Sequence, residues 1–131
     1  MLEVRGLAAR YGSSQVLFGI DIEVGEGELV TLMGRNGMGK TTTVRAITGL
    51  TPSFAGSIRF AGVEIAAEPA HLRARRGIGL VPEGRQIFAT LSVEENLCAT
   101  ARSGAWKLVR VLELFPRLAE RRRNMGRQLS G

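Results

Sequence analysis

The first third of the chain alternates between hydrophobic and polar positions. Residues 2–7 form a short, partly alternating run, and residues 16–24 place an apolar side chain at every second position toward their end. Alternation with a period of two predicts β-strands that bury one face. A third short strand is predicted at residues 57–61, which lie between two glycines. We therefore expect β-structure in this part of the chain.

Two further runs are almost entirely hydrophobic. Residues 29–33 and residues 78–81 lack the alternation of a half-exposed strand, and they predict strands buried on both faces of a parallel sheet. A glycine-rich loop follows the first run. A helix is expected from residue 40 to about residue 48, where Gly49 supplies a stop.

The last third of the chain has the spacing of helices. Ser92 and Glu95 form a capping box, in which the two residues satisfy each other's free backbone N–H groups, so a helix should begin at Ser92 and reach about residue 102. Residues 106–115 repeat hydrophobic side chains at helical spacing, and the proline that follows should begin one or two further turns. A shorter helix is expected at residues 69–76, which open with a proline.

Length and composition limit the class of protein. The 131 residues suit one small domain or a piece of a larger one, and 44% of them are hydrophobic, which is enough for a core. No run approaches the ~20 apolar residues of a membrane span. The N-terminus has no apolar stretch typical of a secretory signal, and the single cysteine cannot form an internal disulfide. A cytosolic protein is expected.

The net charge of +6 comes almost entirely from arginine. Arginines cluster at positions 73, 75 and 76 and again between residues 121 and 127. Such clusters favour solvated helix faces, and the alternative is proximity to a membrane protein or to anionic lipid. The five Phe, one Trp and one Tyr are not interleaved with the arginines as a base-stacking platform requires, so we expect no nucleic-acid partner.

Residues 34–41, after the first apolar run, match the pattern G-x-x-x-x-G-K-S/T. In such a P-loop, successive backbone N–H groups point at phosphate oxygens, and the following helix adds its positive N-terminal end. Lys40 would reach the β- and γ-phosphates, Thr41 would bind Mg²⁺, and Thr42 would hydrogen-bond the α-phosphate. The motif predicts a nucleoside triphosphate site. Its other candidate residues are Gly34, Asn36, Gly37 and Gly39.

Three features outside the loop complete a family pattern. Tyr11 lies upstream in Arg-Tyr-Gly, Glu83 lies in Val-Pro-Glu-Gly-Arg, and residues 129–131 read Leu-Ser-Gly. With the P-loop, they resemble the ATP-binding subunits of ABC transporters along essentially the whole chain. The resemblance implies ATP and Mg²⁺ as cofactors, with Tyr11 stacked on adenine and Val16 packed beside it. On position alone, a tyrosine that covers a strand edge is an equal alternative.

Ser130 and Gly131 resemble the opening of the family signature L-S-G-G-Q. The resemblance implies that they contact the ATP held by a second subunit. A complete subunit of this family continues to an aspartate that helps to hold Mg²⁺, a catalytic glutamate and a switch histidine. None of these lies within the 131 residues, so we expect a fragment that lacks residues required for hydrolysis.

Glu83 departs from the family, which has glutamine at this position, the Q-loop, near Mg²⁺ and the attacking water. A glutamate oxygen can bind Mg²⁺, but an ionised carboxylate cannot donate a hydrogen bond. We assign the catalytic Q-loop role and a Mg²⁺ contact to Glu83, with Gln86 as the alternative. The surrounding sequence resembles one branch, the ATPases of branched-chain amino acid importers, and the urea importers are close neighbours.

The resemblance implies an α/β fold: a P-loop NTPase core with an N-terminal antiparallel β-subdomain and a C-terminal helical subdomain, truncated. Residues 1–131 would form one incomplete ABC-type ATP-binding domain. Its parts would be residues 1–33, mainly β, residues 34–84, the P-loop half of the core, and residues 85–131, the helical subdomain up to the start of the signature.

The expected function is an importer ATPase, peripheral on the cytoplasmic face of the inner membrane. Two such subunits, identical or different, would enclose ATP and drive a membrane permease between inward and outward states. A periplasmic solute-binding protein would be an indirect partner. The alternatives are an ATPase of a urea or other small-solute importer, a soluble ABC-type ATPase acting on DNA or ribosomes, a non-catalytic nucleotide-binding fragment, and a small-molecule P-loop kinase.

Overall fold

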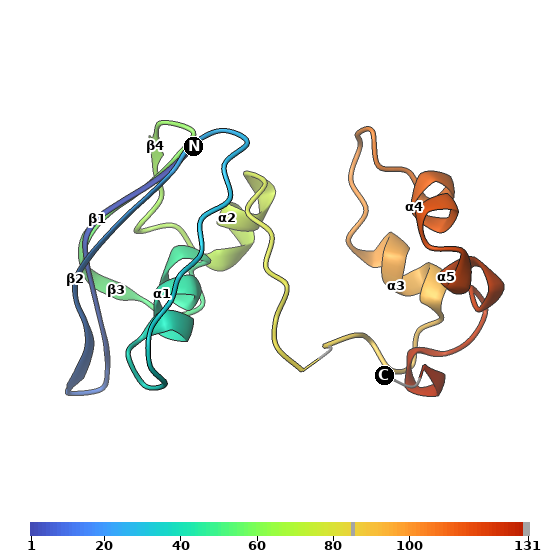
Figure 1. Ribbon diagram of the computed structural model, residues 1–131, viewed down its shortest axis with the longest axis horizontal. Helices are drawn as coiled ribbons and strands as arrows, with labels where there is room; N and C mark the ends of the chain where they lie inside the picture. Colours follow the sequence, from blue (N-terminus) through green and yellow to red (C-terminus); the bar gives the residue numbers. More distant parts are fainter. Residues whose placement is uncertain (85, 130–131) are drawn as a thin grey trace. The chain divides into compact units, whose positions relative to one another are not determined.

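The computed structural model describes residues 1–84 and 86–129 and separates into two compact units, Met1–Leu80 and Val81–Gly131 (Figure 1). The first unit contains a four-stranded sheet with helices α1 (Lys40–Ile47) and α2 (Ala70–Arg75), and the second unit contains short helices. No helix in the two described ranges is long and apolar enough to cross a lipid bilayer.

The sheet of the first unit is antiparallel and has the strand order β2-β1-β3-β4. Its strands are β1 (Leu2–Tyr11), β2 (Ser14–Val24), β3 (Ser53–Phe60) and β4 (Val63–Glu64). They run beyond the predicted bounds because backbone pairing continues through residues whose side chains do not alternate. The predicted N-terminal antiparallel sheet is confirmed.

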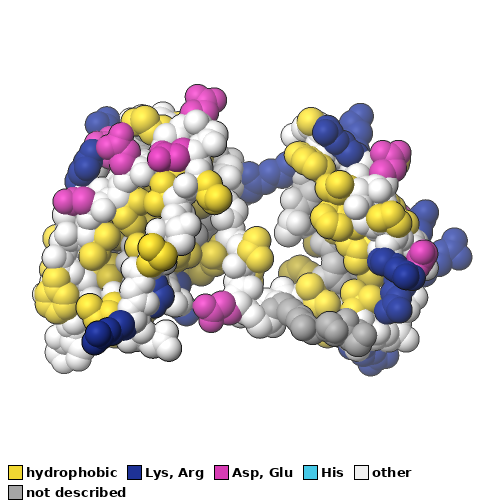
Figure 2. Space-filling view, in the orientation of Figure 1, with side chains coloured by type: hydrophobic (Ala, Val, Ile, Leu, Met, Phe, Trp, Pro, Cys, Tyr) yellow, Lys and Arg dark blue, Asp and Glu magenta, His cyan; other side chains and the backbone are white. Residues whose placement is uncertain are grey.

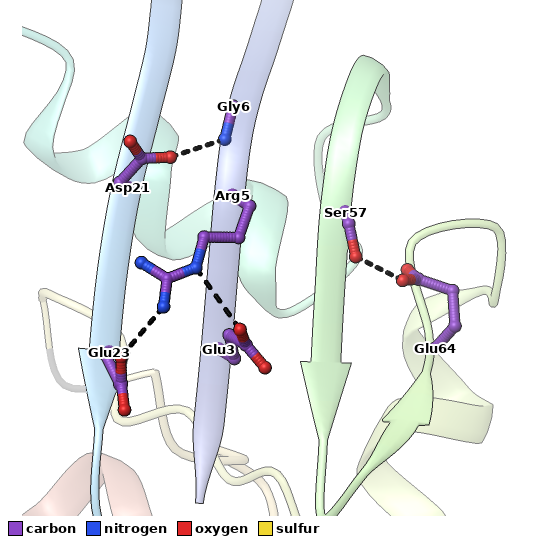
Figure 3. A network of polar contacts seen from close by, with 7 residues as sticks. All are labelled: Glu3, Arg5, Gly6, Asp21, Glu23, Ser57 and Glu64. Carbon is purple, nitrogen blue, oxygen red and sulfur yellow. Dashed lines mark hydrogen bonds and ion pairs between the residues drawn. The ribbon is translucent and has the colours of Figure 1, made fainter.

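An irregularity in β1 lies where its pairing with β2 shifts register between Val4 and Leu7. There the backbone N–H of Gly6 donates to Asp21 Oδ1 at 2.6 Å, across the hairpin (Figure 3). β3 comes so close on the other side that a Cβ added to Gly56, whose φ is +94°, would lie 2.6 Å from the Gly6 carbonyl oxygen. Both space and backbone conformation therefore require glycine at position 56.

Helix α1 (Lys40–Ile47) packs on this sheet through a small hydrophobic core. Its innermost side chain, Ala46, is fully buried. The buried members of the core are Val4, Leu7, Ala9, Leu17, Ala46, Ile58 and Ile65. They come from the hairpin, from β3, from α1 and, for Ile65, from the residue after β4, so the core fixes the P-loop helix against the β1–β2 hairpin.

A buried arginine ties helix α2 (Ala70–Arg75) to the end of α1. Arg73 is only 3% exposed, so the prediction that all three arginines of this cluster are solvated is wrong for Arg73. The guanidinium donates to the carbonyl oxygens of Ala46, Ile47, Ala66 and Glu68, at 2.6 to 2.9 Å. Its planar fork of donors satisfies carbonyl groups at the end of α1 that have no partner within the helix.

The second unit contains the helices α3 (Val93–Ala99), α4 (Leu108–Leu114) and α5 (Pro116–Glu120) and the 3₁₀ turn η1 (Gly126–Gln128). The predicted capping box is confirmed, since Glu95 N–H donates to Ser92 Oγ at 3.2 Å and Ser92 N–H donates to Glu95 Oε2 at 2.7 Å. The hydrogen bonds that the Ser92 N–H and the Ser92 hydroxyl donate to the Glu95 carboxylate lower the pKa of Glu95. The helices begin close to the predicted positions but are shorter.

The two hydrophobic runs that predicted buried parallel strands are not strands in the structure. In the ranges described, neither residues 29–33 nor residues 78–81 pair with another strand. A strand exists only through hydrogen bonds to a neighbour, so an apolar run without one stays irregular. Leu29 is 92% exposed and Val81 is 96% exposed. Hydrophobic side chains are accordingly visible on the surface of both units (Figure 2).

Candidate functional site

The glycine-rich loop leads directly into α1, which begins at Lys40. The residue before it, Gly39, has a left-handed conformation with φ of 84°, and no side chain caps the helix within the described part of the chain. The first N–H groups of a helix have no partner inside it and carry its positive partial charge. The start of α1 is therefore suited to bind an anion.

Gly39 also packs against the hairpin. A Cβ added at this position would lie 2.6 Å from Leu17 Cδ2 and 3.4 Å from the Val16 carbonyl oxygen. Position 39 thus needs glycine for its backbone conformation and for its space. Val16 is half-buried against the core, so the predicted site residues Val16 and Gly39 lie next to each other.

The side chain of Lys40 folds back over the loop. Its ammonium donates to the carbonyl oxygens of Gly34 at 2.7 Å and Arg35 at 2.9 Å. These two bonds hold the positive charge beside the loop, where an incoming phosphate group would meet it. Charge-assisted contacts to phosphate are stronger than bonds to neutral carbonyls, so a phosphate competes well for the ammonium.

The threonines that follow Lys40 differ in exposure. Thr41 is exposed, whereas Thr42 is 8% and Thr43 is 3% exposed. The Thr43 hydroxyl donates to the Gly39 carbonyl oxygen at 2.9 Å and so fixes the end of the loop. The sequence analysis did not identify Thr43, although a threonine in a helix often donates to the carbonyl oxygen four residues before it.

Tyr11 stands at the end of β1 and is 49% exposed. Its hydroxyl lies 3.2 Å from Thr51 Oγ1. Hydrogen bonds from Thr51 and from Thr42 lower the pKa of the phenol, and the positive charge of Arg45 acts in the same direction. Because Thr42 belongs to the first turn of α1, Tyr11 lies beside the start of the P-loop helix.

The remaining predicted site residues are Glu83, Ser130 and Gly131, which belong to the second unit. Glu83 is exposed in a turn of the second unit. Ser130 and Gly131 lie outside the described residues. The predicted roles of all three therefore stay predictions.

The residues at the loop fit Mg²⁺ bound together with a nucleotide. Within residues 1–84 and 86–129, no group of three or more His, Cys, Asp or Glu side chains is placed to hold a metal ion. Mg²⁺ beside a nucleotide takes most of its oxygen ligands from phosphates and water and needs only one or two from the protein. The exposed Thr41 hydroxyl, next to the start of α1, meets that requirement.

A profile of the family described as "ABC transporter" matches residues 17–131. The chain belongs to the ABC transporter family, as the resemblance of its motifs predicted. A solved structure titled "Structure of ATP binding subunit of ABC transporter" superposes with a TM-score of 0.83 at 31% identity, covering 99% of this chain and 56% of that one. The predicted fold class is confirmed by this match.

The names of two curated relatives state different transport functions. A protein of Pseudomonas aeruginosa named "High-affinity branched-chain amino acid transport ATP-binding protein BraG" is 40% identical over 100% of this chain and 58% of its own length. An Escherichia coli protein named "Lipopolysaccharide export system ATP-binding protein LptB" is 38% identical over 99% of this chain and 57% of its own length. The chain thus spans somewhat more than half the length of these relatives.

Proposed function

We propose that these 131 residues belong to the nucleotide-binding subunit of a transporter that imports branched-chain amino acids, and that the complete subunit binds and hydrolyses ATP. The observation that carries the proposal is the P-loop itself. Its last glycine is locked against the hairpin, the uncapped start of α1 faces the loop, and the Lys40 ammonium lies across it. The helix start and the ammonium favour an anionic ligand, and the packing of the glycine fixes the loop that would hold a chain of phosphates.

In this proposal each residue has a separate task. The loop N–H groups and the Lys40 ammonium bind the β- and γ-phosphates, and the Thr42 hydroxyl binds the α-phosphate. The Thr41 hydroxyl contributes one ligand to Mg²⁺, which neutralises charge on the phosphate oxygens when it is bound. Tyr11 stacks on adenine, which extends from the α-phosphate side, and Val16 packs beside the base.

The proposed assembly is larger than one chain. A second ATPase subunit, identical or different, would contact the ATP on this P-loop through its signature serine. Ser130 and Gly131 would contact the ATP bound to the second subunit in the same way. Permease subunits would couple closure of the pair to transport, with a periplasmic solute-binding protein acting through them. We place the protein at the cytoplasmic face of the inner membrane.

The transported solute is the most specific part of the proposal. The relative that transports branched-chain amino acids, at 40% identity, supports it, together with the Val-Pro-Glu-Gly-Arg segment around Glu83. Lipopolysaccharide export is a second candidate, because LptB is 38% identical over nearly the whole chain. An importer of urea or another small solute is a third.

Deletion of the gene is expected to abolish most high-affinity uptake of labelled leucine and to leave urea uptake unchanged. The reason is that the ATPase supplies the free energy for transport by its own permease only. Uptake by the deletion strain, compared with a strain carrying the gene on a plasmid, measures this. Loss of urea uptake alone would refute the assignment, and accumulation of lipopolysaccharide at the inner membrane would favour the export role.

Replacing Glu83 with alanine is expected to lower kcat by about 10-fold or more and to leave the affinity for ATP nearly intact. A residue that orients water acts mainly in the transition state, so its loss appears in kcat. The matched control is Gln86→Ala, and Glu83→Gln should retain activity because the amide keeps an oxygen that can bind Mg²⁺. Steady-state kinetics of ATP hydrolysis measure kcat for each protein. If Glu83→Ala has the kcat of the wild type and Gln86→Ala has a lower one, the role belongs to Gln86.

A further inference from the structure

We propose that Thr51 is a positioning residue that holds the ring of Tyr11 ready to stack on the base of ATP. The inference rests on the proposed function, since it assumes that a nucleotide occupies the P-loop. It assigns a role to a residue outside the loop motif and 40 positions away from Tyr11.

Thr51 is a rigid anchor for the hydroxyl of Tyr11. It is 2% exposed, and its position in the chain is fixed because the N–H groups of Leu50 and Thr51 both donate to the Arg45 carbonyl oxygen, at 2.8 and 3.1 Å. The Thr51 hydroxyl lies 3.2 Å from the Tyr11 hydroxyl. The hydroxyl of a buried residue, in the loop that follows α1, therefore meets a phenol that comes from the hairpin.

Tyr11 needs such an anchor because of where it stands. It pairs with Ser14 at the end of the hairpin, beyond which the chain turns through residues 12 and 13. Half of the side chain is exposed, so ring surface is available to a planar ligand. Without a bond at its hydroxyl, a side chain at a hairpin end would occupy several rotamers.

The anchor sets the ring on the correct side of the phosphate site. The phenol is hydrogen-bonded to Thr51, its pKa is lowered also by the Thr42 hydroxyl, and Thr42 follows Lys40 and Thr41 in the first turn of α1. With phosphates at the start of α1, a base connected through the α-phosphate would lie on the Thr42 side of the loop. A ring already held there loses less conformational freedom when the nucleotide binds.

A pH titration tests whether the bond exists in solution. Tyr11 is the single tyrosine among these 131 residues, and the difference in phenolate absorbance between the wild type and Tyr11→Phe reports on it. The Thr51 hydroxyl has the largest effect on the pKa of Tyr11 and lowers it, and Thr42 lowers it further. Burial raises this pKa, and the positive charge of Arg45 lowers it. Thr51→Val should raise the pKa of Tyr11 toward its ordinary value of about 10. An unchanged pKa would show that the bond does not form.

Binding titrations then separate the base from the phosphates. We compare MgATP with magnesium tripolyphosphate, which has the phosphate chain but no base, for the wild type, Thr51→Val, Tyr11→Phe and the double variant of the intact protein. Each single variant is expected to bind ATP about 2- to 10-fold more weakly, the range for one lost hydrogen bond. The double variant should lose no more than either single variant, and tripolyphosphate affinity should be equal throughout.

The matched control is Thr48→Val. Thr48 lies three residues before Thr51, and its hydroxyl donates within its own helix, to the carbonyl oxygens of Val44 and Arg45. Its ATP affinity should equal that of the wild type. If Thr51→Val binds ATP as well as the wild type does, or loses tripolyphosphate in parallel, the positioning role is wrong. If the wild type binds neither ligand, the phosphate site itself is wrong.

Discussion

Replacing Lys40 with alanine is expected to weaken MgATP binding by about 10- to 150-fold, which corresponds to about 1.5–3 kcal/mol for a charged hydrogen-bonding group. The Lys40 ammonium is held across the loop by its hydrogen bonds to the carbonyl oxygens of Gly34 and Arg35. Alanine removes the charge that would face the β- and γ-phosphates. ATP hydrolysis should fall further, since charge on the transferred phosphoryl group grows in the transition state.

The control for this experiment is the same substitution at Lys107, the other lysine of the chain. Lys107 is exposed and precedes α4 in the second unit, so Lys107→Ala should bind MgATP like the wild type. Calorimetric titration of the three proteins measures the affinities. Equal affinities for wild type and Lys40→Ala would remove the nucleotide site from this loop.

Replacing Arg73 with leucine is expected to lower the free energy of unfolding by about 2–4 kcal/mol. The guanidinium is 3% exposed and supplies donors to four carbonyl oxygens, two of them at the end of α1. Leucine fills part of the space but leaves the carbonyls of Ile47, Ala66 and Glu68 without partners in a partly buried place, whereas the Ala46 carbonyl keeps a bond from the Gly49 N–H. Such unpaired groups account for most of the expected loss.

Arg76→Leu is the matched control, because Arg76 sits one turn further along and forms an ion pair with Glu68 at 2.6 Å with its side chain 39% exposed. An exposed pair of this kind contributes little, so the loss should stay below about 1 kcal/mol. Urea unfolding followed by circular dichroism gives both values. Similar losses for the two variants would mean that Arg73 does not bind the carbonyls in solution.

The sequence was sufficient where a feature depends on neighbours in the chain. The capping box of Ser92 and Glu95 forms as predicted, and α1 begins at Lys40, because a helix start is decided within four residues. The P-loop could be recognised for the same reason, since its geometry belongs to eight consecutive residues.

Features that depend on distant neighbours could not be predicted. Residues 29–33 have the composition of a buried strand, but a strand also requires a partner, and composition says nothing about whether one is present. Arg73 belongs to a run of arginines, and only the fold distinguishes the buried member from the exposed ones. The contact between Thr51 and Tyr11 joins residues 40 positions apart, and no local pattern marks it.

The fit of Gly39 against Leu17 has a consequence for how the sequence can diverge. Because a Cβ at position 39 would fall 2.6 Å from Leu17 Cδ2, substitutions at the two sites are not independent. A smaller residue at 17 frees the space but leaves the left-handed backbone at 39 unfavourable for any side chain. Position 17 can therefore change only to hydrophobic residues no larger than leucine that still fill the core, whereas position 39 must remain glycine. In a mutational scan of both sites together, functional variants should carry substitutions at position 17 but none at position 39.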